Sequence, residues 1–270
     1  MTSPVLEARR VTMQFGGLKA LADFDLALAP RELVGLIGPN GAGKTTAFNA
    51  ITGVYPPTGG EVWVGGVRVN GWRPHQICCQ GVARTFQNIR LFRELTALDN
   101  VRVACHQGSS AGWVAALLRT GRFLADEAAI TRRAEEYLAV MGLAVRRDEL
   151  ARNLPYGEQR RLEIARALAA GPRVLCLDEP AAGMNASEKV ALMELIRKIR
   201  DDFGLAILVI EHDMRVVMGV SERLVVLDHG VTIAEGPPDR IRRDPRVIEA
   251  YLGDSYLEER HISLPAEKVP

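Results

Sequence analysis

The chain has 270 residues, enough to bury the core of one large domain or two small ones. Its 34 Lys and Arg nearly balance its 33 Asp and Glu, and the net charge of +1 gives no global field that favours nucleic acid or anionic lipid. The strongest apolar runs, 33–37 and 205–210, are far shorter than the ~20 residues of a membrane-spanning helix, and residues 1–10 do not resemble a signal peptide.

The beginning of the chain predicts a β-rich segment. Apolar stretches alternate with turn residues, namely Gly16-Gly17, Pro30 and a Pro-Pro-Thr-Gly-Gly turn at 56–60. The two stretches after this last turn are spaced as a hairpin. The strand-like segments are 5–15, 24–29, 32–37, 61–64 and 67–70.

A phosphate-binding loop is predicted between the strand at 32–37 and a helix at about 44–52. It fits the pattern G-x-x-x-x-G-K-[ST] at every fixed position, and the strand–loop–helix context argues against a chance match. Glycines let the backbone wrap a polyphosphate, the helix N-terminus adds positive potential, Lys44 reaches the β- and γ-phosphates, and Thr45 can ligate Mg²⁺. The predicted ATP contacts are Gly38, Pro39, Asn40, Gly41, Ala42, Gly43, Lys44, Thr45 and Thr46.

Residues from about 91 to 164 have a helical pattern. Between 130 and 141 apolar residues recur at steps of three and four, and Gly142 offers a C-terminal stop. A second apolar set favours a packed helical subdomain over a helix lying on a membrane surface. This set is Trp113, Val114, Leu117, Leu118 and Leu124.

From residue 173 onward, strands and helices alternate, which predicts a mainly parallel α/β sheet. A short helix capped by Asp244 and Pro245 follows, and the polar residues 254–270 predict a flexible tail. The expected elements are 174–177, 186–203, 206–210, 214–220, a hairpin turning at 228–230, and a helix at 244–252.

Two carboxylates end the apolar strand at 174–177, at the edge of the sheet where α/β proteins bind ligands. Asp178 can hold Mg²⁺, and Glu179 lies one step nearer the γ-phosphate, where it can orient and deprotonate the attacking water. Two acids in a strand-end loop are common, but beside a phosphate loop they favour a catalytic site. Residues 154–159 (Leu-Pro-Tyr-Gly-Glu-Gln) open another helix, whose N-terminus offers a second anion site beside Gly157.

The four cysteines show no C-x-x-C spacing, and two of them are adjacent, which makes a poor disulfide pair. This usage is typical of reduced thiols in a cytosolic protein rather than of metal ligands or a catalytic thiol. The residues are Cys78, Cys79, Cys105 and Cys176.

With these motifs in this order, residues 5–253 resemble the ATP-binding subunits of ABC transporters. Gln87 matches the family's Q-loop glutamine, His212 its switch histidine, and Phe15 stands where the family stacks an aromatic ring on adenine. The matching segments are 38–45 (Walker A), 85–88 (Q-loop), 154–159 (signature), 174–180 (Walker B), 181–185 (D-loop) and 211–213 (switch).

The resemblance implies an α/β fold, with a P-loop NTPase (RecA-like) core, an N-terminal antiparallel β subdomain and an inserted α-helical subdomain. The ATPase domain would span 1–253. Its core would take about 1–88 and 162–253, and the helical subdomain about 89–161.

The resemblance also implies how ATP is held and hydrolysed. Two subunits meet head to tail, so that each ATP lies between one subunit's Walker A loop and the other's signature. Water attacks the γ-phosphate in line, with Glu179 as general base and His212 holding that phosphate. The implied catalytic residues are Glu179, His212 and Gln87. The implied Mg²⁺ ligands are Thr45, Gln87 and Asp178, and the implied ATP contacts in trans are Leu154, Tyr156, Gly157, Glu158 and Gln159.

The implied partners are a second ABC ATPase subunit, two transmembrane permeases and, indirectly, a periplasmic or extracellular solute-binding protein, with no nucleic acid. The chain would lie on the cytoplasmic face of the inner membrane as a peripheral subunit. Residues 89–101, apolar with interspersed charges, match both the packing of the helical insert and the groove that receives a permease's coupling helix.

Within the family, the chain is most similar to the ATPases of branched-chain amino acid uptake. Urea/amide and lipopolysaccharide-export ATPases share parts of the same stretches. A soluble ABC ATPase is disfavoured because the chain has no second cassette and no long coiled-coil insertion. A small-molecule kinase is disfavoured by the signature and switch histidine. The stretches that carry the similarity are 15–21, 48–53, 179–185 and 247–253.

The chain departs from the family pattern at two positions. Pro155 stands where the signature usually has Ser, which removes a hydroxyl and a backbone N–H, both potential γ-phosphate donors. Asn185 stands where Asp is commonest in the D-loop, although the branched-chain group shows the same change. We therefore expect the isolated subunit to be a poor ATPase, because a homodimer would place Pro155 in both ATP sites.

Overall fold

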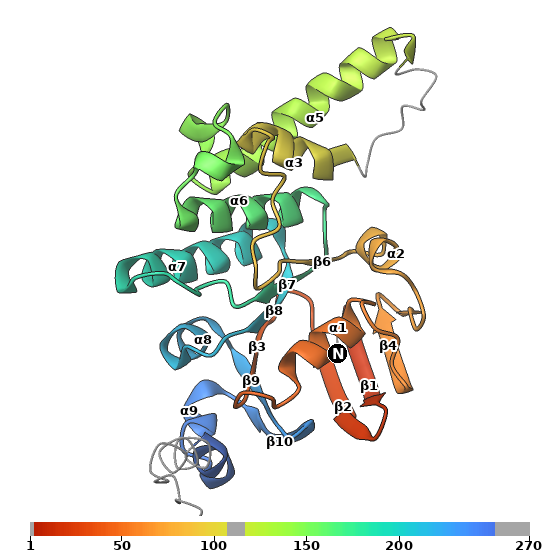
Figure 1. The fold of residues 1–270 in the computed structure, drawn as a ribbon, viewed down its shortest axis with the longest axis vertical. Coiled ribbons are helices and arrows are strands. Elements are labelled where there is room, and N and C mark those ends of the chain that lie inside the picture. Colours follow the sequence, from red (N-terminus) through yellow and green to blue (C-terminus); the bar gives the residue numbers. More distant parts are fainter. Residues whose placement is uncertain (1–2, 107–116, 252–270) are drawn as a thin grey trace, which may run out of the picture.

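Two β-sheets organise the chain, and the structure, a computed structural model, describes residues 3–106 and 117–251 (Figure 1). The first sheet is antiparallel, with strand order β2-β1-β4-β5. Its strands are β1 (Leu6–Phe15), β2 (Leu18–Leu28), β4 (Gly59–Val64) and β5 (Val67–Arg68). The predicted N-terminal antiparallel β subdomain is therefore confirmed.

The second sheet has the order β10-β9-β3-β8-β7-β6, in which all neighbours are parallel except the hairpin of β9 and β10. Three central strands are buried along their whole length, which explains their continuous apolar sequences. The strands are β3 (Leu33–Ile37), β6 (Val82–Arg84), β7 (Val174–Asp178), β8 (Ala206–Ile210), β9 (Arg223–Asp228) and β10 (Val231–Gly236).

Helices cover both sheets, and α3, α5 and α6 pack together at the end of the molecule far from the antiparallel sheet (Figure 1). Within residues 3–106 and 117–251, no helix has the length and hydropathy to cross a membrane. The α-helices are α1 (Lys44–Ile51), α2 (Pro74–Cys79), α3 (Ala97–Cys105), α5 (Gly121–Val140), α6 (Tyr156–Ala169), α7 (Ala186–Phe203), α8 (Met214–Val220) and α9 (Pro238–Ile241). Two 3₁₀ turns, η2 (Ala144–Arg146) and η3 (Ala151–Asn153), join α5 to α6, and the chain is helical again at 245–251.

The parallel sheet separates two hydrophobic clusters, because successive side chains of a strand point to opposite faces. On β7, Leu175 and Leu177 join the cluster under the helical end, whereas Val174 and Cys176 join the cluster shared with α1 and the antiparallel sheet. Burial raises the pKa of the Cys176 thiol to about 12, so this cysteine stays protonated and unreactive.

One packing prediction is wrong. Leu117, Leu118 and Leu124 are 75%, 69% and 55% exposed, instead of packing in the helical subdomain. The reason is that α5 buries Ile130, Ala134 and Leu138 of its C-terminal part, while its N-terminal end projects beyond α3 and α6 (Figure 1). Two other members of that apolar set, Trp113 and Val114, and the tail predicted at 254–270 lie outside the described residues.

Gly35 tests how tightly the centre of the parallel sheet is packed. A Cβ at this position of β3 would lie 2.5 Å from Val217 Cγ2 and 2.7 Å from Ser221 Oγ. Gly35→Ala should therefore lower the free energy of unfolding by about 1–3 kcal/mol through overpacking. Gly17→Ala is the matched control, since a Cβ there meets nothing within 4 Å. Denaturant titration of both variants checks this, and equal stabilities would contradict the packing described.

Candidate nucleotide site

Four sequence motifs meet at the carboxyl edge of the parallel sheet. The phosphate loop follows β3, Asp178 ends β7 and Glu179 follows it, His212 follows β8, and Gln87 follows β6. These strands are parallel neighbours in the order β3-β8-β7-β6, so their carboxyl ends face the same side. Segments far apart in the sequence thus form one edge, the usual ligand site of open α/β sheets.

The phosphate loop is held in a conformation that only glycine permits at two positions. Gly38 has φ +151°, and a Cβ there would lie 2.1 Å from Leu227 O. Gly43 has φ +100°, and a Cβ would lie 2.7 Å from Ala20 O. Gly43 is also the N-cap of α1, which begins at Lys44 and has no acidic residue in its first turn. The open end of α1 therefore offers N–H groups and positive potential to an anion.

Lys44 lies across this loop. Its Nζ donates hydrogen bonds to Gly38 O (2.5 Å) and Pro39 O (2.8 Å), and the residue is only 9% exposed. Neutral carbonyls therefore hold the ammonium at the loop, where it can meet the phosphates of a nucleotide. Thr45, next to it on α1, is exposed and can present its hydroxyl to a cation.

Arg84 is a site residue that the sequence reasoning missed. Its Nη2 lies 2.7 Å from Asp178 Oδ2, and both side chains are more than nine-tenths buried. Nη1 donates to Asn49 Oδ1 on α1 at 2.7 Å, and the guanidinium carbon lies 5.4 Å from the Phe48 ring centroid and 5.2 Å from that of Phe86. Arg84 therefore joins β6, β7 and α1 and fixes the carboxylate of Asp178. Its only sequence signal is a charged residue at the end of a short apolar segment.

Glu179, Gln87 and His212 form a second cluster. Gln87 Nε2 donates to Glu179 Oε2 at 3.1 Å, and His212 Nδ1 lies 3.6 Å from the same oxygen. Glu179 has φ +46°, a conformation that is costly for a residue with a side chain, while its N–H donates to Ile210 O at 2.9 Å. The structure thus brings together the three residues predicted to be catalytic. The strained backbone at Glu179 sets the direction of its carboxylate.

Glu211, between β8 and His212, is a second missed residue. It is 1% exposed, and its Oε1 accepts a hydrogen bond from the Ala181 N–H at 2.7 Å. Burial raises the pKa of this carboxyl above its ordinary value, while the N–H groups of Ala181 and Asp213 act in the opposite direction. Glu211 therefore ties the switch segment to the start of the D-loop.

Asn185, at the end of the D-loop, has a structural explanation. Its side chain accepts a hydrogen bond from Glu188 N (3.0 Å), and Glu188 Oε2 accepts one from Asn185 N (2.9 Å). This reciprocal pair is a capping box that begins α7. Asn caps a helix as well as Asp does, so the departure from the family pattern costs the fold little.

The signature residues begin α6. Pro155 is the N-cap, gives no side-chain cap, and its carbonyl accepts from Glu158 N and Gln159 N, each at 2.9 Å. Leu154 is buried, and its carbonyl accepts a hydrogen bond from Gln159 Nε2 at 2.8 Å. Leu154 and Gln159 therefore stabilise the first turn of α6. Tyr156 is 46% exposed. Whether these residues reach an ATP in trans stays a prediction.

Phe15, predicted to stack on adenine, ends β1 and is 45% exposed. Its ring meets that of Tyr55 edge to face, with centroids 5.6 Å apart. The ring is exposed enough to contact a flat ligand, and stacking on adenine also remains a prediction.

Comparison with known proteins decides the family. A model of the ABC transporter family matches residues 21–182. LivG of Escherichia coli K12, a "high-affinity branched-chain amino acid transport ATP-binding protein", is 47% identical over 94% of this chain and 100% of its own length. BraF of Pseudomonas aeruginosa, described in the same words, is 45% identical over the same shares. The chain belongs to the ABC transporter ATPases.

Other relatives of this ABC ATPase agree with that family and its fold. The ADP conformation of MJ1267, an ATP-binding cassette of an ABC transporter, superposes with a TM-score of 0.81 at 27% identity, covering 93% of this chain and 100% of that one. LptB of Escherichia coli K12, a lipopolysaccharide export ATP-binding protein, is 32% identical over 93% of this chain and 98% of its own. The chain is therefore an ATP-binding cassette that hydrolyses ATP, with the predicted P-loop fold.

Pro155 gives a testable consequence at this site. Pro155→Ser should raise the ATPase rate of the isolated protein by ~5–10-fold, because a restored hydrogen bond to the γ-phosphate contributes about 1–1.5 kcal/mol in the transition state. Pro155→Ala restores only the backbone N–H, so a smaller gain there would assign the rest to the hydroxyl. Phosphate release at saturating ATP is the measurement. An unchanged or lower rate for the serine variant, with folding and ATP affinity intact, would show that Pro155 is tolerated.

Proposed function

We propose that this ABC ATPase couples hydrolysis of Mg-ATP to the import of branched-chain or closely related amino acids. The identity to LivG and BraF, which extends over nearly the whole chain, carries the proposal. A model named for the branched-chain amino acid ATP-binding cassette transporters also matches residues 231–256, outside the general family match. Lipopolysaccharide export is the second candidate, since LptB is 32% identical.

In this proposal the γ-phosphate lies at the sheet edge, between the phosphate loop with Lys44 and the cluster of Glu179, Gln87 and His212. The open end of α1 and Lys44 hold the phosphates, and Glu179 accepts a proton from the attacking water. Gln87 holds Glu179 by the hydrogen bond to Oε2, and His212, which lies near the same oxygen, would hold the γ-phosphate. The barrier falls because these groups are already placed before the reaction begins.

The residues present also fit a magnesium ion. The hydroxyl of Thr45, the carboxylate of Asp178 and the amide oxygen of Gln87 are hard oxygen donors, the type that Mg²⁺ selects. Asp178 is already oriented by Arg84. When bound, the ion would neutralise negative charge on the β- and γ-phosphates.

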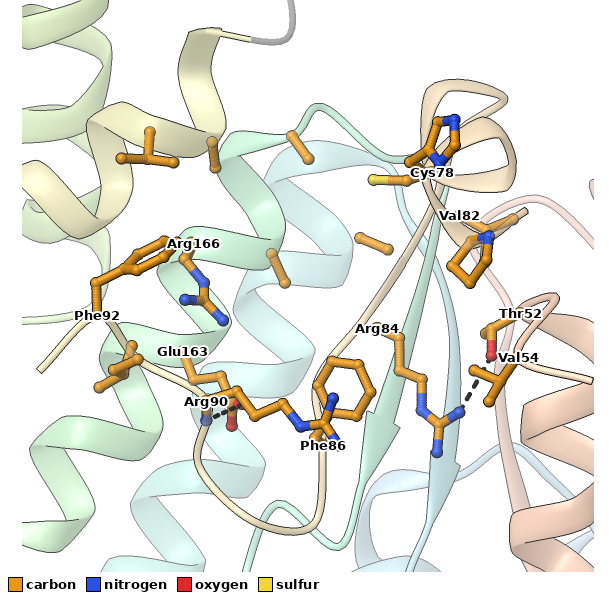
Figure 2. A pocket seen from close by; sticks show the side chains of 18 residues that line it. Thr52, Val54, Cys78, Val82, Arg84, Phe86, Arg90, Phe92, Glu163 and Arg166 are labelled. Atoms are coloured by element: carbon orange, nitrogen blue, oxygen red, sulfur yellow. Dashed lines mark hydrogen bonds between the residues drawn. The ribbon is translucent and has the colours of Figure 1, made fainter.

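A groove beside the site is the proposed docking surface for the permease (Figure 2). It has a volume of about 760 Å³ and lies between α2, the Q-loop, α3 and α6. Phe92 and Val103 on its wall are 48% and 46% exposed, and Arg90 and Arg166 project from the sides. Of the stretch 89–101, residues 90–92 line the groove and Leu98 and Val101 are buried in the core. The burial agrees with the predicted packing role, and the groove lining supports the proposed docking role.

The proposed assembly has four membrane-associated subunits. Two ATPase subunits, this chain with a copy of itself or with a related ATPase, would bind two permeases from the cytoplasmic face of the membrane. A solute-binding protein outside that membrane would deliver the amino acid. Each ATPase would offer its groove to one permease helix.

Reconstitution tests the proposal. The chain should co-purify with two hydrophobic permeases encoded beside it, and vesicles containing the complex and the binding protein should take up leucine only with Mg-ATP. Phe92→Glu should abolish co-purification, because it buries a charge in the apolar groove. Val145→Glu is the control, since Val145 is 90% exposed on η2, away from the groove. ATP-dependent transfer of lipopolysaccharide without leucine uptake would favour export instead.

A further inference from the structure

Arg160, on the second turn of α6, is a buried cation whose contacts reach another part of the chain. It is 1% exposed. Its Nη1 donates to Phe86 O at 2.5 Å and its Nη2 donates to Gln87 O. One guanidinium thus holds the carbonyls of two successive Q-loop residues, each through its own nitrogen, so the rigid planar fork of Arg fixes both at once.

The Q-loop depends on this contact. Residues 85–96 join β6 to α3 without regular secondary structure. Within the described chain, the backbone hydrogen bonds found for residues 86–90 go to Arg160 and to Glu163, whose Oε1 accepts from Arg90 N at 3.1 Å. Arg160 and Glu163 also pair with each other at 3.0 Å. The backbone that carries Gln87 is therefore fastened to α6 through this buried pair.

Arg160 also contacts the signature, whose Tyr156 lies one helical turn earlier on α6. Arg160 Nη2 also donates to Tyr156 OH at 3.3 Å. Tyr156 packs on the D-loop so closely that a Cβ on Gly183 would lie 3.1 Å from its Cε1. Arg160 consequently connects the signature and the D-loop on one side with the Q-loop on the other.

The buried pair also adjoins the proposed permease groove. Phe86, Arg90 and Glu163 line that groove (Figure 2), and the first two belong to the segment 86–90, whose backbone the pair holds. A helix seated in the groove would therefore press on the same segment that carries Gln87 at the nucleotide. A rigid link from the Q-loop to α6 would transmit that displacement to the signature.

We propose that Arg160 is a positioning residue, which keeps the Q-loop in register with the signature helix so that Gln87, the signature and the groove respond together. This inference rests on the proposed role of Gln87 at the nucleotide and of the groove as the permease site. Arg160 is not among the residues that line the groove, and in this proposal it acts through the backbone of residues 86 and 87.

Arg160→Lys in the full chain tests the inference. The ammonium keeps the charge opposite Glu163 but loses the fork, so kcat for Mg-ATP should fall by at least ~10-fold, because small misplacements of catalytic groups are costly. The KM for ATP should change by less than ~3-fold, since the phosphate loop is untouched. Arg161→Lys is the matched control, as this neighbour donates to Met141 O, outside the Q-loop. A lower melting temperature with unchanged kcat would overturn the inference.

A double-mutant cycle separates positioning through Gln87 from any other effect. If Arg160 acts by placing Gln87, the Gln87→Ala/Arg160→Lys double variant should have a kcat within ~2-fold of Gln87→Ala alone. Multiplicative losses would overturn the inference and leave the proposed function intact. A wild-type kcat for Gln87→Ala would remove the proposed role of Gln87 at the nucleotide and, with it, this inference.

A second variant covers the case in which Arg160→Lys does not fold. Arg160→Met/Glu163→Leu removes both charges of the buried pair together, so neither is left buried without the other. It should show the same loss of kcat at near-normal KM. A wild-type kcat in this folded variant would overturn the inference.

Discussion

The parallel pairing of β3, β8, β7 and β6 is the constraint on which the site depends. Because these neighbours run in the same direction, the segments that follow them in the sequence emerge at one edge. The phosphate loop, Glu179, His212 and Gln87 share that edge for this reason alone. The strands themselves are buried on both faces, so the hydrophobic cores on either side hold the geometry.

Buried charges then set the positions of the functional groups within that edge. Arg84 orients Asp178, Arg160 fastens the backbone of Gln87, and Glu211 ties the switch segment to the D-loop. Burial of such groups is expensive; the two arginines are paired with Asp178 and Glu163, and Glu211 accepts the Ala181 N–H. All three link segments from different strands or helices, so we interpret them as fixing relative position more than as adding stability.

The sequence predicted most of the fold because its strong signals are local. The boundaries of α7, β8 and α8 agree with the predicted ranges, since apolar periodicity and caps determine them nearly alone. The motifs around Lys44 and Glu179 are recognisable for the same reason, because the residue types that bind phosphate or activate water stand next to each other in the sequence. The exposed Leu124 was mispredicted because periodicity shows that a helix has an apolar face and does not show where the neighbouring helices end.

The buried arginines could not be assigned from the sequence. The partners of Arg160 in the Q-loop are backbone carbonyls 73 and 74 residues away. Every residue has such a carbonyl, so the residue types do not show which ones are bound. Arg84 has a carboxylate partner, but Asp178 is 94 residues away and already had a predicted role as a metal ligand. The contacts predicted between Tyr156, Gly157 and ATP would depend on a second subunit, so neither one sequence nor one folded chain can show them.

The central claim is that Glu179 activates water within an ATP site shared by two subunits. Gel filtration of Glu179→Gln with saturating Mg-ATP tests it most directly. The amide cannot take a proton, so hydrolysis should slow by at least ~100-fold, and the protein should elute as a dimer with ATP retained. A variant that stays monomeric under these conditions, or that turns over ATP at the wild-type rate, would contradict the claim.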